Sequence, residues 1–455
     1  MMKDSFDIVI VGAGSAGSVT AFTLCKKGFQ VALVERKAKE IIGKKVCGDA
    51  VSADSFNISG IPKPRGEERK QIFKGLDLYS PNMKSKLRIK TDDFRGYIID
   101  RRLFGQRLLK LALDAGAQLF EKRHVTGIIH NKNQILGIKA KGLENRKNEV
   151  FKGKLVVDAS GSSAVIRRKL SPMLAGFIES KISKKDTYFG YREIRNVQQP
   201  LEDPEYLKIY LNQESAPKGY IWVFSRGEEA QPSVNVGVGG AAGYNFDFRA
   251  QFEKYVHGNP FFTNSEIIDQ GSGYVPRRRA IDSLVTNGFV LAGDAACQVN
   301  PLHAGGLSPS LEVGDMITKT FEEAFEQGDF TAKSLWSYNV HYQRTIGVRY
   351  SSHDMVKIIL NEATNEELDF ILNRQIISQK DLTDIGITGD EFQISSIEKI
   401  KRGLKLIRKP SLLFRLNKAS NLMNEIREHY KIYPEDINQF IDWETKLRRR
   451  YYPIT

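Results

Sequence analysis

The sequence predicts an α/β protein in which a Rossmann-type dinucleotide-binding domain is combined with an antiparallel sheet domain and a helical C-terminal region. Three observations predict this architecture. A glycine-rich turn joins an apolar run to a helical pattern close to the N-terminus. Short segments with alternating or β-branched apolar residues fill residues 61–94 and 176–274, and the pattern is helical from residue 331 onward.

The first element is the glycine-rich turn with its flanks, FDIVIVGAGSAGSVTAFTLCKKGFQVALVER. An apolar run stops at Gly12, a helical pattern follows Gly17, and a second apolar run ends in Glu35. Gly12 permits a tight turn, Gly14 lets the backbone approach a pyrophosphate, and Gly17 lets the helix pack on the strand. Glu35 can accept hydrogen bonds from a ribose. In this full context the motif predicts dinucleotide binding.

Three later segments each join a strand or helix to polar residues. They read YIIDRRLFGQRLLKLALDAGAQLF (97–120), LVVDASGSSAVIRRKL (155–170) and GFVLAGDAACQVNPLHAGGLSPSLEVGDMI (288–317). In this order they resemble the signatures of flavoproteins of the aromatic hydroxylase and geranylgeranyl reductase superfamily. The resemblance covers residues 1–330 and implies FAD as the dinucleotide. A second nicotinamide-binding motif is missing, because the glycine cluster at 233–245 lacks the required spacing, helix and acid.

The resemblance also implies roles for single residues. It places Asp294 on the ribityl chain of FAD, Arg101 near the phosphates or ribose, and the backbone of Val125 beside the adenine. An exposed charge on a helix is the alternative for Arg101. The helix that starts near Gly306 would point its N-terminus at the flavin. The predicted cofactor-binding residues are Gly12, Gly14, Ala16, Gly17, Glu35, Cys47, Gly48, Ala50, Arg101, Val125, Asp294, Gly306 and Leu307.

The stretch PKGYIWVFS (217–225) places Tyr220, Trp222 and Phe224 at alternate positions, and therefore on one face of a strand. Packing in a core and lining an apolar cavity are both compatible with this pattern. The stretch resembles the geranylgeranyl reductase signature P-x-x-Y-x-W-x-F-P, with Ser225 in place of the last proline. Other segments similar to that family are KVCGDAVS (45–52), VNPLHAGG (299–306) and RKPSLLFRL (408–416). Membership of the family implies that the aromatic face binds an isoprenoid chain.

Four residues are candidates for catalysis, namely Cys47, Tyr220, Trp222 and His303. The resemblance places the Cys47 and His303 loops beside the flavin. A small buried cysteine and a structural histidine are the alternatives for these two. The three cysteines are too few and too scattered for a disulfide framework or a zinc site.

The predicted domains are interleaved along the chain. No glycine-rich linker precedes the C-terminal helices, so we expect them to pack on the sheet domain. The predicted boundaries are 1–60, 95–175 and 275–330 for the FAD-binding domain, 61–94 and 176–274 for the antiparallel sheet, and 331–455 for the helical region.

The chain carries a formal net charge of +14 and a pI near 9.4, which favour anionic partners. No zinc-finger, RNP or helix-turn-helix signature indicates nucleic acid. Residues 399–418 and 446–452 interleave basic and apolar side chains, a pattern that suits an anionic membrane surface as well as ordinary solvated helices. No apolar run approaches the ~18 residues of a membrane span. We expect a cytoplasmic protein with peripheral membrane contact.

The resemblance implies an FAD-dependent reductase that saturates C=C bonds of geranylgeranyl chains in archaeal-type ether lipids or their precursors. The electron donor stays open among NAD(P)H, ferredoxin and a reduced deazaflavin. An FAD-dependent monooxygenase acting on an apolar substrate is one alternative. A lipid carrier that retains FAD as a structural group is the other.

Overall fold

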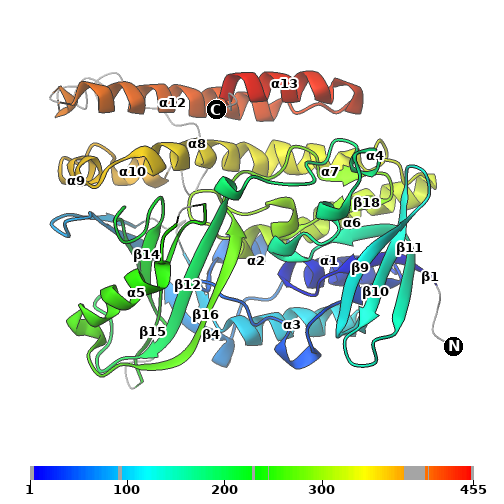
Figure 1. The fold of residues 1–455 in the computed structure, drawn as a ribbon, viewed down its shortest axis with the longest axis horizontal. Coiled ribbons are helices and arrows are strands. Elements are labelled where there is room, and N and C mark those ends of the chain that lie inside the picture. Colours follow the sequence, from blue (N-terminus) through cyan, green and yellow to red (C-terminus); the bar gives the residue numbers. More distant parts are fainter. Residues whose placement is uncertain are drawn as a thin grey trace.

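The computed structural model describes residues 5–90, 95–227, 231–243, 245–383, 405–407 and 409–451. Figure 1 shows two sheets side by side, with long C-terminal helices running in two layers along both of them. The helices are α1 (Ser15–Lys26), α2 (Ala53–Ser59), α3 (Arg101–Asp114), α4 (Pro172–Ala175), α5 (Phe248–His257), α6 (Leu307–Gln327), α7 (Trp336–Tyr342), α8 (Val348–Glu362), α9 (Asn365–Asn373), α10 (Gln379–Thr383), α12 (Pro410–Lys431) and α13 (Phe440–Tyr451).

The first sheet has the order β17-β18-β11-β1-β2-β8, with β10 and β9 added beside β11. Its central pairings, from β18 through β8, are parallel. The central strands are buried runs of Val, Ile and Leu because helices cover a parallel sheet on both faces. The strands are β1 (Ser5–Val11), β2 (Val31–Val34), β8 (Gln118–Phe120), β9 (Arg123–His130), β10 (Ile135–Gly142), β11 (Asn148–Asp158), β17 (Val285–Thr286) and β18 (Phe289–Leu291).

The second sheet has the order β16-β12-β15-β14-β13-β5-β6. The prediction of an antiparallel sheet is wrong at one place, because β13 pairs with β5 in parallel. A single residue, Lys74, separates β4 from β5. The direction in which β5 runs is therefore set by β4. The strands are β5 (Gly75–Tyr79), β6 (Lys86–Ile89), β12 (Thr187–Asn196), β13 (Tyr206–Tyr210), β14 (Tyr220–Ser225), β15 (Ser233–Ala241) and β16 (Glu266–Pro276).

A small third sheet has the order β3-β7-β4, formed by β3 (Ala50–Ser52), β7 (Gly96–Ile99) and β4 (Arg69–Phe73). β4 comes from the segment assigned to the antiparallel domain, yet it pairs with β7, which comes from an FAD-binding segment. Between β2 and β8 the chain therefore passes through this small sheet on its way to β5 and β6 and on its way back. The domain boundaries given above stay a prediction.

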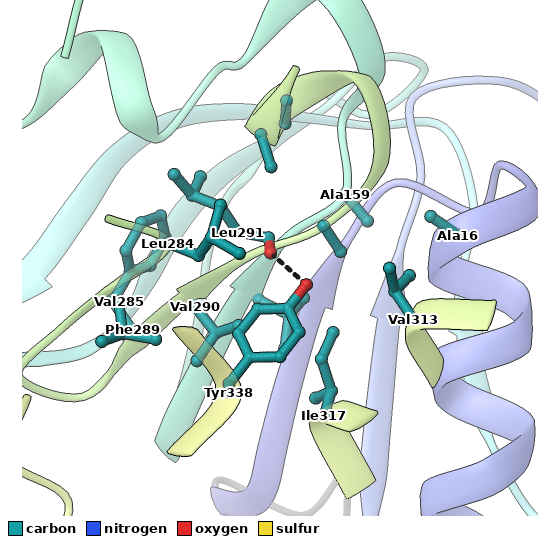
Figure 2. Packing of buried hydrophobic residues seen from close by; sticks show 14 of the residues in the cluster. Ala16, Ala159, Leu284, Val285, Phe289, Val290, Leu291, Val313, Ile317 and Tyr338 are labelled. Atoms are coloured by element: carbon teal, nitrogen blue, oxygen red, sulfur yellow. Dashed lines mark hydrogen bonds between the residues drawn. The ribbon is translucent and has the colours of Figure 1, made fainter. Parts of the chain in front are cut away.

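The main core lies between the first sheet, α6 and α7. Figure 2 shows Tyr338 of α7 packed beside Val290 and Ile317, with its hydroxyl directed at the carbonyl of Leu291. That hydroxyl donates a hydrogen bond of 3.2 Å to the Leu291 oxygen. The expectation that the C-terminal helices pack on the antiparallel sheet is therefore incomplete. The region packs on the first sheet through α7 and reaches the second sheet farther on, where Asn361 donates to the Tyr188 hydroxyl.

The central strands β14 and β15 of the second sheet are buried on both faces. Val236 of β15 packs with Phe252 of α5 on one face, while Trp222 and Phe224 of β14 pack with Phe73 on the other.

None of the helices in the described part of the chain combines the length and hydropathy that a membrane span requires.

Candidate flavin and substrate site

The glycine turn between β1 and α1 contains three motif glycines. The fold requires two of them, Gly12 and Gly17, but not Gly14. Gly12 has φ +101°, and a Cβ there would lie 2.5 Å from the Ala159 oxygen. A Cβ at Gly17 would lie 1.9 Å from the Gly12 oxygen. A Cβ at Gly14 would meet nothing within 4 Å, and Gly14 is the N-cap of α1 without a side-chain cap. The uncapped helix end thus faces open space, which fits a pyrophosphate. Ala16, in the first turn of α1, is buried at this end of the helix.

Glu35 follows β2 and lies beside the same turn. Its Oε2 accepts a hydrogen bond of 2.7 Å from the Ala13 amide, and its Oε1 accepts one of 2.8 Å from the Lys37 amide. Each carboxylate oxygen keeps a lone pair for a ribose hydroxyl. The Arg123 amide donates to the Glu35 carbonyl, so the start of β9, with the buried Val125, lies next to the expected ribose position.

Arg101 begins α3 and is buried, with 8% of its surface exposed, so the alternative of an exposed helix charge is wrong. Its Nη2 donates a hydrogen bond of 2.7 Å to the hydroxyl of Ser15, the first residue of α1. Its Nε and Nη1 are buried without a hydrogen-bond partner within the described residues. A buried cation with two such nitrogens beside a helix N-terminus fits an anionic ligand such as the phosphates of FAD.

Asp294 lies at the N-terminus of α6. A Cβ on Gly306 would lie 2.9 Å from Asp294 Oδ1, and α6 begins at Leu307 without a side-chain cap. Asp294 Oδ2 also accepts a hydrogen bond of 2.6 Å from the Lys45 ammonium. The sequence analysis missed Lys45, which links the Cys47 loop to this acid. The arrangement presents an acceptor and uncapped helix amides at one place, as a ribityl chain and flavin would require.

The Cys47 loop, which is the first part of the segment 45–52, packs against the aromatic strand β14. A Cβ at Gly48 would lie 2.9 Å from the Phe224 ring and 3.7 Å from Trp222 Nε1. Trp222 and Phe224 are both buried, whereas Tyr220 and Cys47 keep accessible surface. The structure therefore brings two of the motifs seen in the sequence into direct contact. Ala50 follows in β3 and packs against the same aromatic cluster.

The loop that carries His303 is fastened to the second sheet through three consecutive carbonyls. The Tyr220 hydroxyl donates a hydrogen bond of 2.6 Å to the His303 oxygen. Arg277 donates from Nε to the Pro301 oxygen at 2.9 Å and from Nη2 to the Leu302 oxygen at 2.8 Å. The remaining nitrogen, Nη1, donates to the Lys218 oxygen at 2.6 Å, in the turn before β14.

Three of the predicted catalytic side chains have shifted pKa values although they keep accessible surface. Burial and the nearby Arg277 cation lower the pKa of His303 to about 4. Burial raises the pKa of Tyr220 to about 12, and burial together with the Asp49 charge raises the pKa of Cys47. Near neutral pH the imidazole is therefore neutral, and the phenol and the thiol hold their protons.

Sequence reasoning also missed Asn235 and Arg277. Asn235 lies in the glycine- and valine-rich strand β15, which predicted only sheet and turn. Arg277 lies in the run PRRRA, which is indistinguishable from an exposed basic segment, yet only 4% of its surface is exposed. An asparagine in a strand of valines was the one usable signal, because asparagine is depleted in strands.

We expect Arg277→Lys to loosen the His303 loop. A lysine ammonium is a point donor that cannot reproduce the planar fork bound to three carbonyls. The loss of even one hydrogen bond to a charged group, about 1.5–3 kcal/mol, predicts at least tenfold faster amide exchange in residues 299–306. Hydrogen exchange read by mass spectrometry measures this. The matched control is Arg107→Lys, at a partly buried pair with Glu68. Equal exchange in the parent and the Arg277 variant would contradict the assignment.

Comparisons with known proteins show the family of this chain. Residues 186–275 match the family described as geranylgeranyl reductase catalytic domain, and residues 6–205 match the family described as pyridine nucleotide-disulphide oxidoreductase. Digeranylgeranylglycerophospholipid reductase of Sulfolobus acidocaldarius is 32% identical over 98% of this chain and 97% of its own length. The protein of the same name from Methanosarcina acetivorans is 30% identical over 81% of this chain and 88% of its own length.

Solved structures share the fold. A geranylgeranyl bacteriochlorophyll reductase-like protein from Thermoplasma acidophilum aligns with a TM-score of 0.76 at 22% identity, covering 91% of this chain and 99% of its own. A myxobacterial FAD-dependent chondrochloren halogenase aligns with a TM-score of 0.65 at 14% identity, covering 93% of this chain and 97% of its own. The predicted fold class and FAD cofactor are confirmed. The chain belongs to the geranylgeranyl reductase family of FAD-dependent oxidoreductases.

Proposed function

We propose that this protein saturates C=C bonds of geranylgeranyl chains in archaeal-type ether lipids or their precursors. The observation that carries the proposal is the contact between the Cys47 loop and the aromatic strand. It supports an apolar wall beside the position that we propose for the flavin. Relatives that match nearly the whole chain and are named digeranylgeranylglycerophospholipid reductases support the lipid class.

The protein would have to orient an unactivated alkene and keep water away from it. FAD, when bound and reduced, supplies the hydride for one alkene carbon. An isolated C=C bond is poorly electrophilic, so positioning and a dry environment carry much of the catalysis. Trp222, Phe224, Phe73, Leu207 and Ile98 form the buried apolar cluster that would back the substrate chain. Tyr220 adds accessible aromatic surface at its edge.

The second alkene carbon needs a proton. The four candidate residues differ in whether their proton is already used in a hydrogen bond and in how acidic it is. The Trp222 N–H donates to Asn235 Oδ1 at 2.9 Å, and the Tyr220 hydroxyl donates to the His303 carbonyl. The neutral imidazole of His303 accepts a hydrogen bond from the Gly305 amide at Nδ1 and keeps its proton on Nε2, where it is a far weaker acid than a thiol. Cys47 is partly accessible, its neighbour Gly48 contacts the Phe224 ring, and burial, which raises the pKa of the thiol, keeps it protonated. Cys47 is therefore our proposed proton donor.

Anaerobic reoxidation of the flavin tests the proposed function. The chemically reduced protein is mixed without oxygen with a digeranylgeranyl lipid or with its fully saturated counterpart, and the flavin absorbance is followed. A reductase predicts that only the unsaturated lipid restores the absorbance of oxidised flavin. Reoxidation that requires oxygen and proceeds only with substrate would favour the monooxygenase alternative. A flavin that resists reduction would favour the lipid carrier.

We propose that electrons come from an external donor, which is NAD(P)H, ferredoxin or a reduced deazaflavin. The second glycine cluster forms β15 and the turn after it, and the expectation that no helix follows is wrong, because α5 begins at Phe248. The cluster still lacks the G-x-G-x-x-G spacing and the acid of a nucleotide-binding turn. Reduction of the bound flavin by each donor in turn, measured anaerobically, distinguishes the three.

Peripheral membrane binding is part of the same proposal, since the substrate is an anionic lipid. Lys446 and the arginines up to Arg450 are exposed on α13. Arg448 pairs with Glu444 and Arg450 with Glu425, so this cluster is weaker than its sequence suggests. The other predicted basic segment, 399–418, is described only in part: residues 399–404 and Arg408, which also belongs to the segment 408–416, lie outside the described residues.

We expect co-sedimentation with anionic liposomes to fall steeply between dilute buffer and ~0.5 M salt. Each basic residue near the surface contributes about 1 kcal/mol, and this attraction fades within a Debye length of ~8 Å. Neutral liposomes should bind weakly at every salt concentration. Equal binding to both kinds of liposome would contradict the electrostatic part of the proposal.

A further inference from the structure

A buried amide joins the two motifs of the active site. Asn235 of β15 has no exposed surface. Its Oδ1 accepts a hydrogen bond of 2.9 Å from Trp222 Nε1. Its Nδ2 donates to the Cys47 carbonyl at 2.8 Å and to Asp49 Oδ2 at 2.9 Å. Both ends of one planar group are therefore bonded, one to the aromatic strand and the other to the Cys47 loop.

On the strand side, β15 fixes the orientation of the indole. β14 and β15 pair so that Trp222 lies opposite Gly237 and Phe224 opposite Asn235. A Cβ at Gly237 would lie 2.2 Å from the six-membered ring of Trp222, so the indole lies directly over the glycine backbone. The missing side chain at position 237 makes room for the ring, and the amide at position 235 binds its N–H. Two features of one strand thus select a single indole orientation.

On the loop side, the amide stabilises an unfavourable backbone. Asp49 has φ +63°, a left-handed conformation that costs a non-glycine residue free energy, and its carboxylate is fully buried. Asp49 Oδ2 receives one hydrogen bond from Asn235 and one of 3.1 Å from Arg226 Nη1. The amide also binds the carbonyl of Cys47 itself. The position of the Cys47 backbone therefore depends on Asn235.

We propose that Asn235 is a positioning residue that sets the distance between the Trp222 indole and the Cys47 thiol, an inference that rests on the proposed function. The apolar wall and the proton donor must meet the same alkene, and a rigid planar amide bonded to both keeps their spacing constant. A residue with only a structural role would affect stability without changing the Cys47 loop in particular.

Thiol alkylation of the FAD-loaded protein tests the geometry without any lipid substrate. Cys47 is partly accessible, whereas Cys25 and Cys297 are buried, so mass spectrometry of peptides follows Cys47 separately. We expect Asn235→Ala to raise the alkylation rate of Cys47 by at least tenfold. The matched control is Asn339→Ala, which removes an equally buried amide bonded to the Leu284 amide and the Ser283 hydroxyl. An equal Cys47 rate in both variants would overturn the proposal.

Lipid reduction supplies the second readout. We expect Asn235→Ala to keep FAD but to slow the alkene step by at least tenfold, and Asn339→Ala to keep the parent rate. In the Asn235→Ala background, Trp222→Phe should cost less than in the parent because the shared hydrogen bond is already lost. Additive losses would overturn the proposal. Asn235→Ser, which keeps a small polar side chain in the strand, replaces the alanine variant if that variant does not fold. A parent protein without lipid reduction would refute the proposed function, while the alkylation rates still decide the role of Asn235.

Discussion

The Gly14→Val protein is expected to fold and to purify without FAD. A Cβ at this position meets no protein atom within 4 Å, so the added side chain enters only the space in front of α1. There it would keep the helix amides away from the pyrophosphate. Hydrogen bonds to charged groups contribute about 1.5–3 kcal/mol each, so the loss of two lowers FAD affinity by at least ~10²-fold. Flavin absorbance of the purified protein and titration with FAD measure the effect.

Gly243→Val is the matched control for this experiment. A Cβ at Gly243 also meets nothing within 4 Å, and this glycine lies in the turn after β15. The control should retain FAD. Gly12 and Gly17 are unsuitable, because a side chain at either one collides with backbone and disturbs the fold. Full occupancy of FAD in Gly14→Val would contradict the cofactor site.

The Cys47→Ser protein is expected to bind and accept electrons normally but to reduce the alkene at least ~10²-fold more slowly. General acid catalysis contributes about this much, and a hydroxyl is a far weaker acid than a thiol. The Cys47 thiol stays protonated near neutral pH because burial raises its pKa. Single-turnover measurements separate flavin reduction from the alkene step.

Cys25→Ser is the control, because Cys25 lies near the C-terminal end of α1, away from the glycine turn. It should leave both steps unchanged. A loss below about threefold in the alkene step of Cys47→Ser would make Cys47 a packing residue. The proton would then come from water or from another group.

The parts of the site that could be predicted from the sequence are those that backbone geometry imposes. The turn at Gly12 and Gly17 leaves no room for a Cβ, so only glycine serves there and the motif is visible in the sequence. The alternation of Tyr220, Trp222 and Phe224 likewise follows from the two-residue period of a strand. The sequence could not show that Trp222 and Phe224 are covered by the Cys47 loop.

The remaining site residues depend on contacts between distant segments. Lys45 and Asp294 are 249 residues apart, and Asn235 and the Cys47 carbonyl are 188 apart. No local pattern encodes such partners, because a lysine or an asparagine has the same appearance in the sequence whether it is buried or solvated. The parallel pairing of β13 with β5 could not be predicted for the same reason. It depends on the direction in which the chain leaves β4 and enters the second sheet.

Product mass after anaerobic turnover tests the central claim most directly. Dithionite-reduced protein is incubated without oxygen with a digeranylgeranyl lipid, and the lipid is analysed by mass spectrometry. Saturation of C=C bonds predicts products heavier by successive two-hydrogen steps, with none in the Gly14→Val protein. An unchanged lipid mass in the presence of reduced, FAD-loaded protein, or a product that has gained oxygen once air is admitted, would contradict the assignment as a geranylgeranyl reductase.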